Sequence, residues 1–87
     1  MNVSFTSEAF ADFCAWAAAD RRVFQKIKDL ITAVSRDPFK GIGKPEPLKH
    51  QLSGCWSRRI TEEDRLVYTV TGDTIQIISC NYHYTKK

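Results

Sequence analysis

The sequence lacks a long hydrophobic run and has few cysteines, and each shortage excludes a class of protein. No apolar stretch approaches the roughly 20 residues of a membrane-spanning helix, so we expect no membrane segment. The N-terminus also lacks the basic and apolar regions of a secretory signal. The three cysteines, Cys14, Cys55 and Cys80, are widely spaced and odd in number, which argues against a disulfide framework and against a zinc site. We therefore expect a protein of the reducing cytoplasm.

The length and composition predict one small globular domain. The chain has 87 residues, of which 43% are hydrophobic and 26% are charged, so a disordered or collagen-like chain is excluded. We expect a single domain over residues 1–87. A core of this size leaves no room for a large cofactor, so we expect none. We also expect no metal ion, because the sequence has no CxxC motif and no histidine at ligand spacing from a cysteine.

Basic residues are absent from the start of the chain and concentrated in its middle. Residues 1–20 contain no lysine or arginine, whereas residues 21–60 hold ten of the thirteen. This distribution suits a polyanionic partner. For residues 21–36 taken alone, a solvated helix face is the simpler explanation.

Hydrophobic spacing predicts two consecutive helices near the N-terminus. After a short strand at residues 2–5, a helix capped by Thr6 or Ser7 runs to about residue 19. Asp20 caps a second helix, which stops before Pro38 because proline disfavours a helical residue ahead of it. Each helix carries an apolar stripe that we expect to join the core. These stripes are Phe10, Phe13, Cys14 and Ala17 in the first helix, and Val23, Phe24, Ile27, Leu30, Ile31 and Val34 in the second.

The pattern changes to strands after a long loop. Residues 38–54 contain all three prolines and three of the four glycines, and a long loop in so small a domain tends to be functional. Residues 55–61, 65–71 and 74–82 then alternate with a period of two and are joined by short connections. We therefore expect an α+β fold, in which the two-helix hairpin packs on one face of a C-terminal antiparallel sheet.

Three residues have the chemical types that RNA cleavage without a metal ion requires. Such a reaction needs a base for the 2′-hydroxyl, an acid for the departing 5′-oxygen and a cation for the charge on the phosphate. Glu46, His83 and Arg65 match these needs. Neighbouring antiparallel strands run in opposite directions, so the start of the middle strand at Arg65 should lie beside the end of the last strand at His83. Pro45 and Pro47 restrict the backbone on both sides of Glu46.

The residues alone leave a plainer interpretation open. A glutamate in a proline-rich loop is usually solvated, an arginine at a strand start usually lies on the surface, and a lone histidine is usually structural. Four further bases surround the three candidates and favour an RNA site: Lys44, Lys49, Arg58 and Arg59. Arg58 and Arg59 are successive strand residues that face opposite ways, so at most one of them should point into a given site.

The same residues resemble a known family. The motifs are KPEPLK at residues 44–49, LSG at 52–54, WSRRI at 56–60, RLVY at 65–68 and YHY at 82–84. In this order and spacing they resemble the YoeB-type toxins of bacterial type II toxin–antitoxin modules. These toxins are a branch of the RelE superfamily, whose fold is similar to that of small microbial ribonucleases. A histidine often precedes the family's arginine, whereas this chain has Asp64 at that position.

The resemblance implies a ribosome-dependent endoribonuclease that cleaves messenger RNA in the decoding site and is held inactive by a cognate antitoxin. It implies that Glu46 is the general base, that His83 is the general acid and that Arg65 stabilises the transition state. Lys49, Arg59 and Tyr84 would then support the phosphate, the base or the contact with the ribosome. From their place in the sequence, Lys44 and Arg58 are further candidates for binding the RNA and the ribosome. Assembly as a homodimer stays open. The alternative is a catalytically weak relative that serves mainly as an antitoxin-binding module and transcriptional corepressor.

Overall fold

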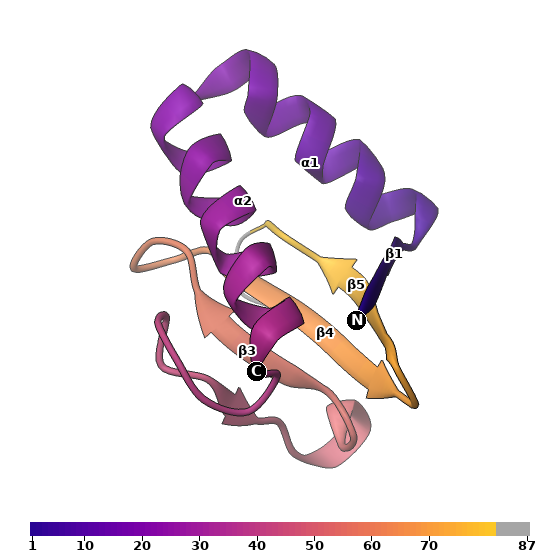
Figure 1. Cartoon of the computed structure of the whole chain (residues 1–87). Helices are drawn as coiled ribbons and strands as arrows, with labels where there is room; N and C mark the ends of the chain where they lie inside the picture. Colours follow the sequence, from indigo (N-terminus) through magenta and orange to yellow (C-terminus); the bar gives the residue numbers. More distant parts are fainter. Residues whose placement is uncertain (82–87) are drawn as a thin grey trace.

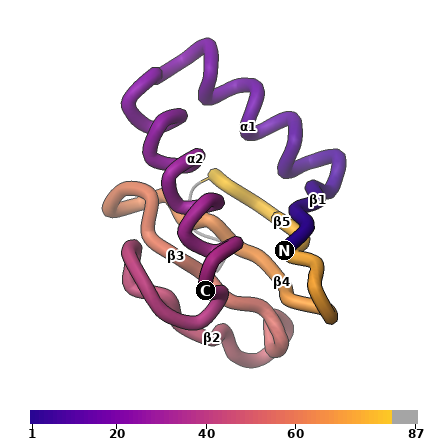
Figure 2. Tube along the Cα trace, viewed as in Figure 1, coloured from indigo at the N-terminus to yellow at the C-terminus, as the bar shows by residue number. Residues whose placement is uncertain are grey.

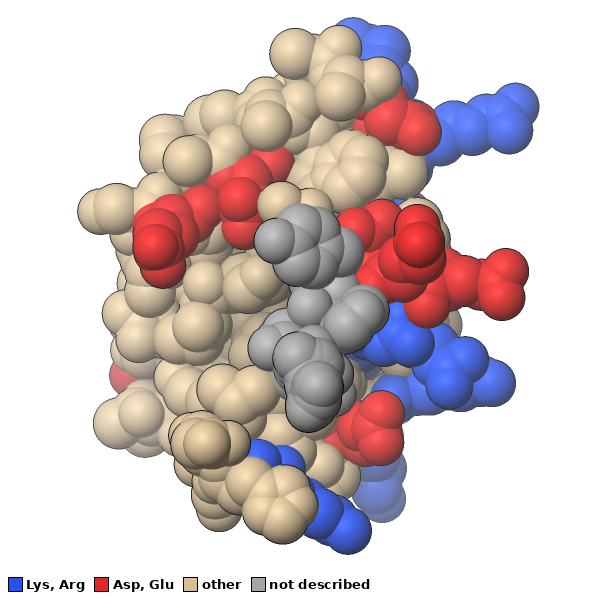
Figure 3. Space-filling view, turned by 180° about the vertical axis from the view of Figure 1, so that it is seen from behind, with Lys and Arg blue, Asp and Glu red and all other residues tan. Residues whose placement is uncertain are grey.

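The computed structural model describes residues 1–81, which form two long helices and a five-stranded sheet (Figures 1 and 2). Side chains from both helices share one buried cluster with the sheet, so both helices lie on the same face. Within residues 1–81 no helix covers the opposite face. Figure 3 shows the surface of the molecule from behind. The expected α+β class is confirmed. The elements are β1 (Asn2–Phe5), α1 (Ser7–Ala19), α2 (Arg21–Arg36), β2 (Glu46–Pro47), the short 3₁₀ helix η1 (His50–Leu52), β3 (Trp56–Arg59), β4 (Arg65–Thr71) and β5 (Thr74–Ser79).

Capping residues set the starts of both helices. The Thr6 hydroxyl oxygen accepts a hydrogen bond from the Ala9 N–H at 3.1 Å, so Thr6 is the N-cap of α1. The Asp20 carboxylate accepts from the N–H groups of Arg22 and Val23, at 3.0 and 3.2 Å, and caps α2. Each cap of this kind stabilises the fold by about 1 kcal/mol.

No helix within residues 1–81 has the length and apolar composition that crossing a membrane requires.

The sheet has the strand order β1-β5-β4-β3-β2. As predicted, β3, β4 and β5 form an antiparallel meander, although β3 and β5 are shorter than expected and β5 ends at Ser79. β1 lies parallel to β5, and the two-residue β2 pairs with β3 at the other edge, where the sequence predicts only loop. The sheet is therefore mixed rather than wholly antiparallel. The pairing of β1 with β5 joins distant segments and leaves no local pattern in the sequence.

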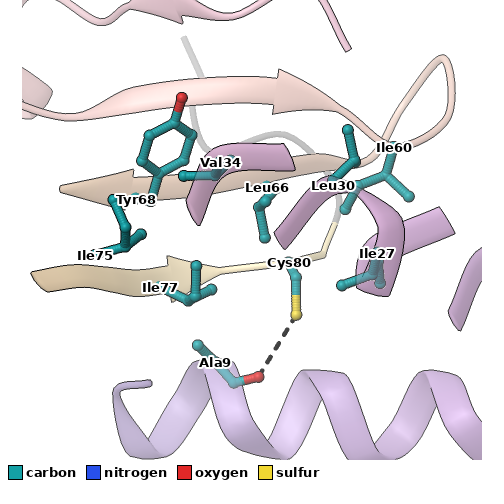
Figure 4. Packing of buried hydrophobic residues seen from close by; sticks show 10 residues of the cluster. All are labelled: Ala9, Ile27, Leu30, Val34, Ile60, Leu66, Tyr68, Ile75, Ile77 and Cys80. Atoms are coloured by element: carbon teal, nitrogen blue, oxygen red, sulfur yellow. Dashed lines mark hydrogen bonds between the residues drawn. The ribbon is translucent and has the colours of Figure 1, made fainter. Parts of the chain in front are cut away.

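The core lies between the helices and the sheet (Figure 4). Burial of each aliphatic side chain in it contributes about 1.5–3 kcal/mol. In the stripe predicted for α2, three of the six residues are buried and three are half-buried, whereas in α1 the buried residue is Ala9 and Phe10 is 56% exposed. The thiol of Cys80 donates a weak hydrogen bond to the Ala9 carbonyl oxygen at 3.5 Å, which ties the end of the sheet to α1. The residues of the buried cluster are Ala9, Ile27, Leu30, Val34, Ile60, Leu66, Tyr68, Ile75, Ile77 and Cys80.

Candidate active site

β2 holds Glu46 in an extended backbone at the edge of the sheet. Glu46 pairs with Ser57 of β3, and Pro47 pairs with Trp56. Pro45 and Pro47 have no backbone N–H to donate, which an edge strand tolerates. The Glu46 side chain is exposed, and within residues 1–81 its carboxylate has no hydrogen-bond or ion-pair partner. Its position suits a group that takes a proton from a bound molecule.

The strand register places Glu46, Arg59 and Arg65 on the helix-free face. Residues directly opposite each other in antiparallel strands point to the same face. Glu46 is opposite Ser57, which is opposite Val67. Arg59 is opposite Arg65, and this pair lies two residues along the strands from Ser57 and Val67, so it shares their face. The intervening residues of β4 belong to the core and point toward the helices.

The same register sets the spacing of these three side chains. Glu46 and Arg59 are diagonal neighbours, with about 7–8 Å between their backbone positions. Glu46 and Arg65 are two strands apart and offset by two residues along the strands, so about 12 Å separates their backbone positions. A phosphodiester group fits between a carboxylate and two guanidinium groups at these separations. Among the described residues, no three His, Cys, Asp or Glu side chains form a group that could hold a metal ion.

Arg65 is anchored by the turn between β3 and β4. Its Nη1 donates to the carbonyl oxygens of Thr61, Glu62 and Asp64, at 2.9, 3.0 and 3.2 Å. Within residues 1–81, Nη2 and Nε make no hydrogen bond, so the guanidinium is fixed on one side and can donate on the other. A cation held in this way can stabilise charge that develops on a phosphate without first reorganising.

The Asp64 carboxylate forms its hydrogen bond within the turn and not with the Arg65 side chain. Its Oδ2 accepts a hydrogen bond from the Thr61 hydroxyl at 2.8 Å. The Thr61 oxygen in turn accepts from the N–H groups of Glu63 and Asp64, at 3.2 and 2.9 Å. The carboxylate therefore closes the turn, and its negative charge stays near Arg65 without occupying the guanidinium.

The chain leaves β5 beside Arg65. The Arg65 N–H donates to the Asn81 carbonyl oxygen at 2.9 Å, which extends the pairing of β4 and β5 to the last described residue. As far as Asn81, the path is the one that the sequence predicts. His83 and Tyr84, the other two candidates that the sequence predicts for this edge, lie outside the described residues.

The remaining bases on the predicted surface are Lys44, Lys49 and Arg59, and all three are exposed. Lys44 has a φ of 52°, in the left-handed region, where the chain turns into β2. Lys49 follows β2 and precedes η1. In Figure 3, Lys and Arg groups alternate with Asp and Glu groups along the right-hand border of this face. The described surface therefore has a mixed charge pattern with local basic groups.

Arg58 is the exception among the predicted RNA-binding residues. It is 0% exposed and lies on the opposite face of β3 from Arg59. The expectation that Arg58 binds RNA is therefore corrected, because a buried guanidinium surrounded by protein acceptors does not reach a substrate. Its four partners inside the protein are the carbonyl oxygens of Asp37, Lys40 and Ile42 and the hydroxyl of Tyr68.

Comparison with known sequences gives a match along nearly the whole chain. The profile of the family described as "YoeB-like toxin of bacterial type II toxin-antitoxin system" matches residues 5–84. Toxin YoeB of Escherichia coli strain K12 is 54% identical over 84 residues, which are 97% of this chain and 100% of that protein.

Solved structures have the same fold. A YoeB/ParE toxin from Agrobacterium tumefaciens has a TM-score of 0.93 and 45% identity, covering 97% of this chain and 100% of that one. YoeB of Staphylococcus aureus, solved as a dimer, has a TM-score of 0.89 and 45% identity, and in its complex with YefM the values are 0.88 and 44%. Both comparisons cover 97% of this chain and 98% of the other. With sequence and fold in agreement over this length, the chain belongs to the YoeB-like toxins of bacterial type II toxin–antitoxin systems.

Proposed function

We propose that this toxin is a ribosome-dependent endoribonuclease, which cleaves messenger RNA in the decoding site of the small ribosomal subunit. The observation that carries the proposal is the common face of Glu46, Arg59 and Arg65 on the helix-free side of the sheet. On this face the Glu46 carboxylate has no partner within residues 1–81, and a turn anchors the Arg65 guanidinium. A base and a fixed cation are two of the three groups that phosphodiester cleavage needs.

The proposed reaction is an attack of the RNA on its own backbone. The 2′-hydroxyl gives its proton to Glu46 while its oxygen bonds to phosphorus. The bond from phosphorus to the 5′-oxygen breaks, and His83 donates a proton to that oxygen. Arg65 stabilises the negative charge that grows on the non-bridging oxygens. The products are a 2′,3′-cyclic phosphate and a 5′-hydroxyl, and no metal ion takes part.

The proposed partners are the ribosome, its bound messenger RNA and an antitoxin. Lys44, Lys49, Arg59 and Tyr84 are the residues proposed to bind RNA and ribosome, since lysine and arginine contacts to phosphate supply much of the affinity for nucleic acids. The Staphylococcus aureus relative was solved with YefM, so an antitoxin similar to YefM is the proposed inhibitor. Action on the ribosome places the proposed site of action in the cytoplasm, and a homodimer is a proposed further assembly, as in that relative.

Mapping of RNA ends in cells after induction tests the proposal. The wild type should create new ends within translated messages, with 5′-hydroxyl termini, and Glu46→Ala should lose them. Products that carry 5′-phosphates would contradict the mechanism. Glu8→Ala is the matched control, because it removes an exposed carboxylate from the first turn of α1 and should keep the wild-type pattern of ends.

The competing function is that of an antitoxin-binding module with little nuclease activity. Expression without an antitoxin separates the two functions. A nuclease should arrest growth, and Glu46→Ala should relieve the arrest. Wild-type protein that binds antitoxin but creates no new RNA ends would favour the binding module.

A further inference from the structure

A buried arginine organises the segment between α2 and β2, residues 37–43. The Arg58 guanidinium lies at the centre of this segment and is 0% exposed. Its Nη2 donates to the carbonyl oxygens of Asp37 and Lys40, at 2.6 and 3.0 Å, and its Nη1 donates to that of Ile42 at 3.1 Å. Because a guanidinium is planar and rigid, three bonds of this kind fix the direction of three carbonyl groups at once.

Tyr68 completes the network from β4. Its hydroxyl oxygen accepts from Arg58 Nε at 3.2 Å, and the hydroxyl donates to the Pro38 carbonyl oxygen at 2.6 Å. Burial raises the pKa of Tyr68 above its ordinary value of 10.0, so the hydroxyl keeps the proton that it donates. One pair of buried side chains therefore binds four carbonyl groups of a single segment.

The far end of the segment is joined to the candidate active site. The Gly43 carbonyl oxygen accepts from the Arg59 N–H at 2.7 Å, so the segment is bonded to the backbone of β3. Gly43 and Lys44 both have positive φ, at 86° and 52°, and turn the chain directly into β2 and Glu46. The position of Glu46 therefore follows from that of the segment.

β2 has little to hold it in place by itself. It consists of Glu46 and Pro47, which pair with two residues of β3, and a strand this short at a sheet edge is weakly held. A buried guanidinium whose hydrogen-bond acceptors are all neutral is costly to desolvate. The hydrogen bonds that offset this cost go to the segment and to Tyr68, so they favour one fixed arrangement of the segment.

We infer that Arg58 and Tyr68 are positioning residues for Glu46, a role that rests on the proposed nuclease function. They touch no substrate, and they act by holding the segment that presents the carboxylate to the helix-free face. Small displacements of a reacting group lower rates steeply, by up to about 100-fold for 1 Å. Loss of the network should therefore lower the rate of cleavage and not the binding of the ribosome.

Tyr68→Phe is the informative variant, because it removes one hydroxyl and keeps the ring in the core. We expect single-turnover cleavage of ribosome-bound messenger RNA to fall about 10-fold. The ribosome concentration that gives half the maximal rate should change less than about two-fold. Hydrogen exchange of the Arg59 N–H, which is bonded to Gly43, should become about 10-fold faster or more. Arg58→Lys keeps the charge but lacks the planar guanidinium, so its cleavage rate and its Arg59 exchange should also depart from the wild-type values.

Ile77→Val is the matched control, since it removes one methylene from the same core directly opposite Tyr68 and leaves every hydrogen bond to the segment in place. It should lower stability and leave both the cleavage rate and the Arg59 exchange unchanged. The inference would be overturned if Ile77→Val and Tyr68→Phe lowered the cleavage rate and the protection of the Arg59 N–H equally. It would also be overturned if Tyr68→Phe kept the wild-type cleavage rate and the wild-type exchange. If the wild type leaves ribosome-bound messenger RNA intact, the proposed function is wrong, and the exchange comparison still decides whether Arg58 and Tyr68 hold the segment.

Discussion

Arg58 and Arg59 are neighbours in β3 and lie on opposite faces of the sheet, Arg58 fully buried and Arg59 at the surface. Arg58 binds the segment 37–43 from the helix side, whereas Arg59 stands opposite Arg65 on the helix-free face. The backbone of Arg59 is bonded to the same segment through Gly43. Two adjacent residues of one type thus have separate roles. Substitutions at Arg58 should loosen the segment 37–43 and lower the cleavage rate, whereas those at Arg59 should weaken binding of RNA and ribosome.

Glu46→Gln should lower the single-turnover cleavage rate by about 10²–10⁴-fold, because an amide does not accept the proton that a general base removes. The melting temperature should stay close to that of the wild type, since the side chain is exposed and unpaired within residues 1–81. Quenched-flow cleavage on programmed ribosomes and thermal unfolding measure the two effects. A large drop in melting temperature would assign Glu46 a structural role instead.

Arg65→Lys should be almost as slow as Arg65→Ala in single-turnover cleavage. A lysine has one compact ammonium, which does not bind the turn carbonyls and a phosphate in the geometry of a guanidinium. The affinity for ribosomes should fall less than the rate, because the charge on the phosphate is largest in the transition state. Equal losses of rate and affinity would make Arg65 a residue of ribosome binding.

Asp64→His should strengthen association with ribosomes at low salt and lower thermal stability. The negative charge lies near Arg65 and acts over about 10 Å at 0.1 M salt. The lost hydrogen bond from the Thr61 hydroxyl should cost about 0.5–1.5 kcal/mol. Asp64→Asn is the control, because it removes the charge and keeps an acceptor for Thr61. Association constants over a salt series check the prediction, and a gain in affinity that does not depend on salt would contradict it.

Gly43→Ala should destabilise the protein more than Gly54→Ala. Both glycines have positive φ, 86° and 96°, so each alanine costs about 1–2 kcal/mol through its backbone. A Cβ at Gly43 would lie 2.7 Å from Leu30 Cδ2 and 3.0 Å from Arg58 Cβ, whereas nothing lies within 4 Å at Gly54. Overpacking at Gly43 should add about 1–3 kcal/mol. Urea unfolding of the two variants measures the difference, and equal losses would mean that the segment is loosely packed.

Cys14 should react with iodoacetamide at pH 8 far faster than Cys80. Cys14 is exposed, whereas burial, assisted by the nearby Asp12 carboxylate, raises the pKa of Cys80 to about 12. The thiolate is the reactive form of cysteine, and Cys80 holds almost none at pH 8. Peptide mass spectrometry over time measures both rates. Rapid labelling of Cys80 in the folded protein would contradict its burial.

The raised pKa of Cys80 also predicts a loss of stability at high pH. The contribution of the neutral thiol is complete below the ordinary pKa of 9.0 and is lost as the pH rises through about 12. Cys80→Ala lacks this titration, so the wild type should lose more stability than the variant across that range. Urea unfolding at a series of pH values checks the difference.

Local chemistry in the sequence is enough to predict the two helices and the antiparallel meander. Thr6 and Asp20 cap the helices because their side chains bind N–H groups only two or three residues away. The three strands of the meander follow one another with short connections, so each pairs with its neighbour in the chain. The sequence likewise identifies Glu46 and Arg65 as candidates for RNA cleavage by their chemical types. The prolines beside Glu46 predict a restricted backbone at that position.

Tertiary structure alone decided which residues share the candidate site. The alternation of β3 predicts that Arg58 and Arg59 point apart, but the packing of both helices on one face decides that Arg58 is the buried one. Likewise, β2 becomes a strand only through its pairing with β3. The physical reason is that a charged side chain is stable inside a protein only when hydrogen-bond partners or opposite charges surround it, and the partners of Arg58 come from distant parts of the chain. The partners of Arg58 lie 10 to 21 positions away in the chain, a separation at which no periodicity in the sequence records the contact.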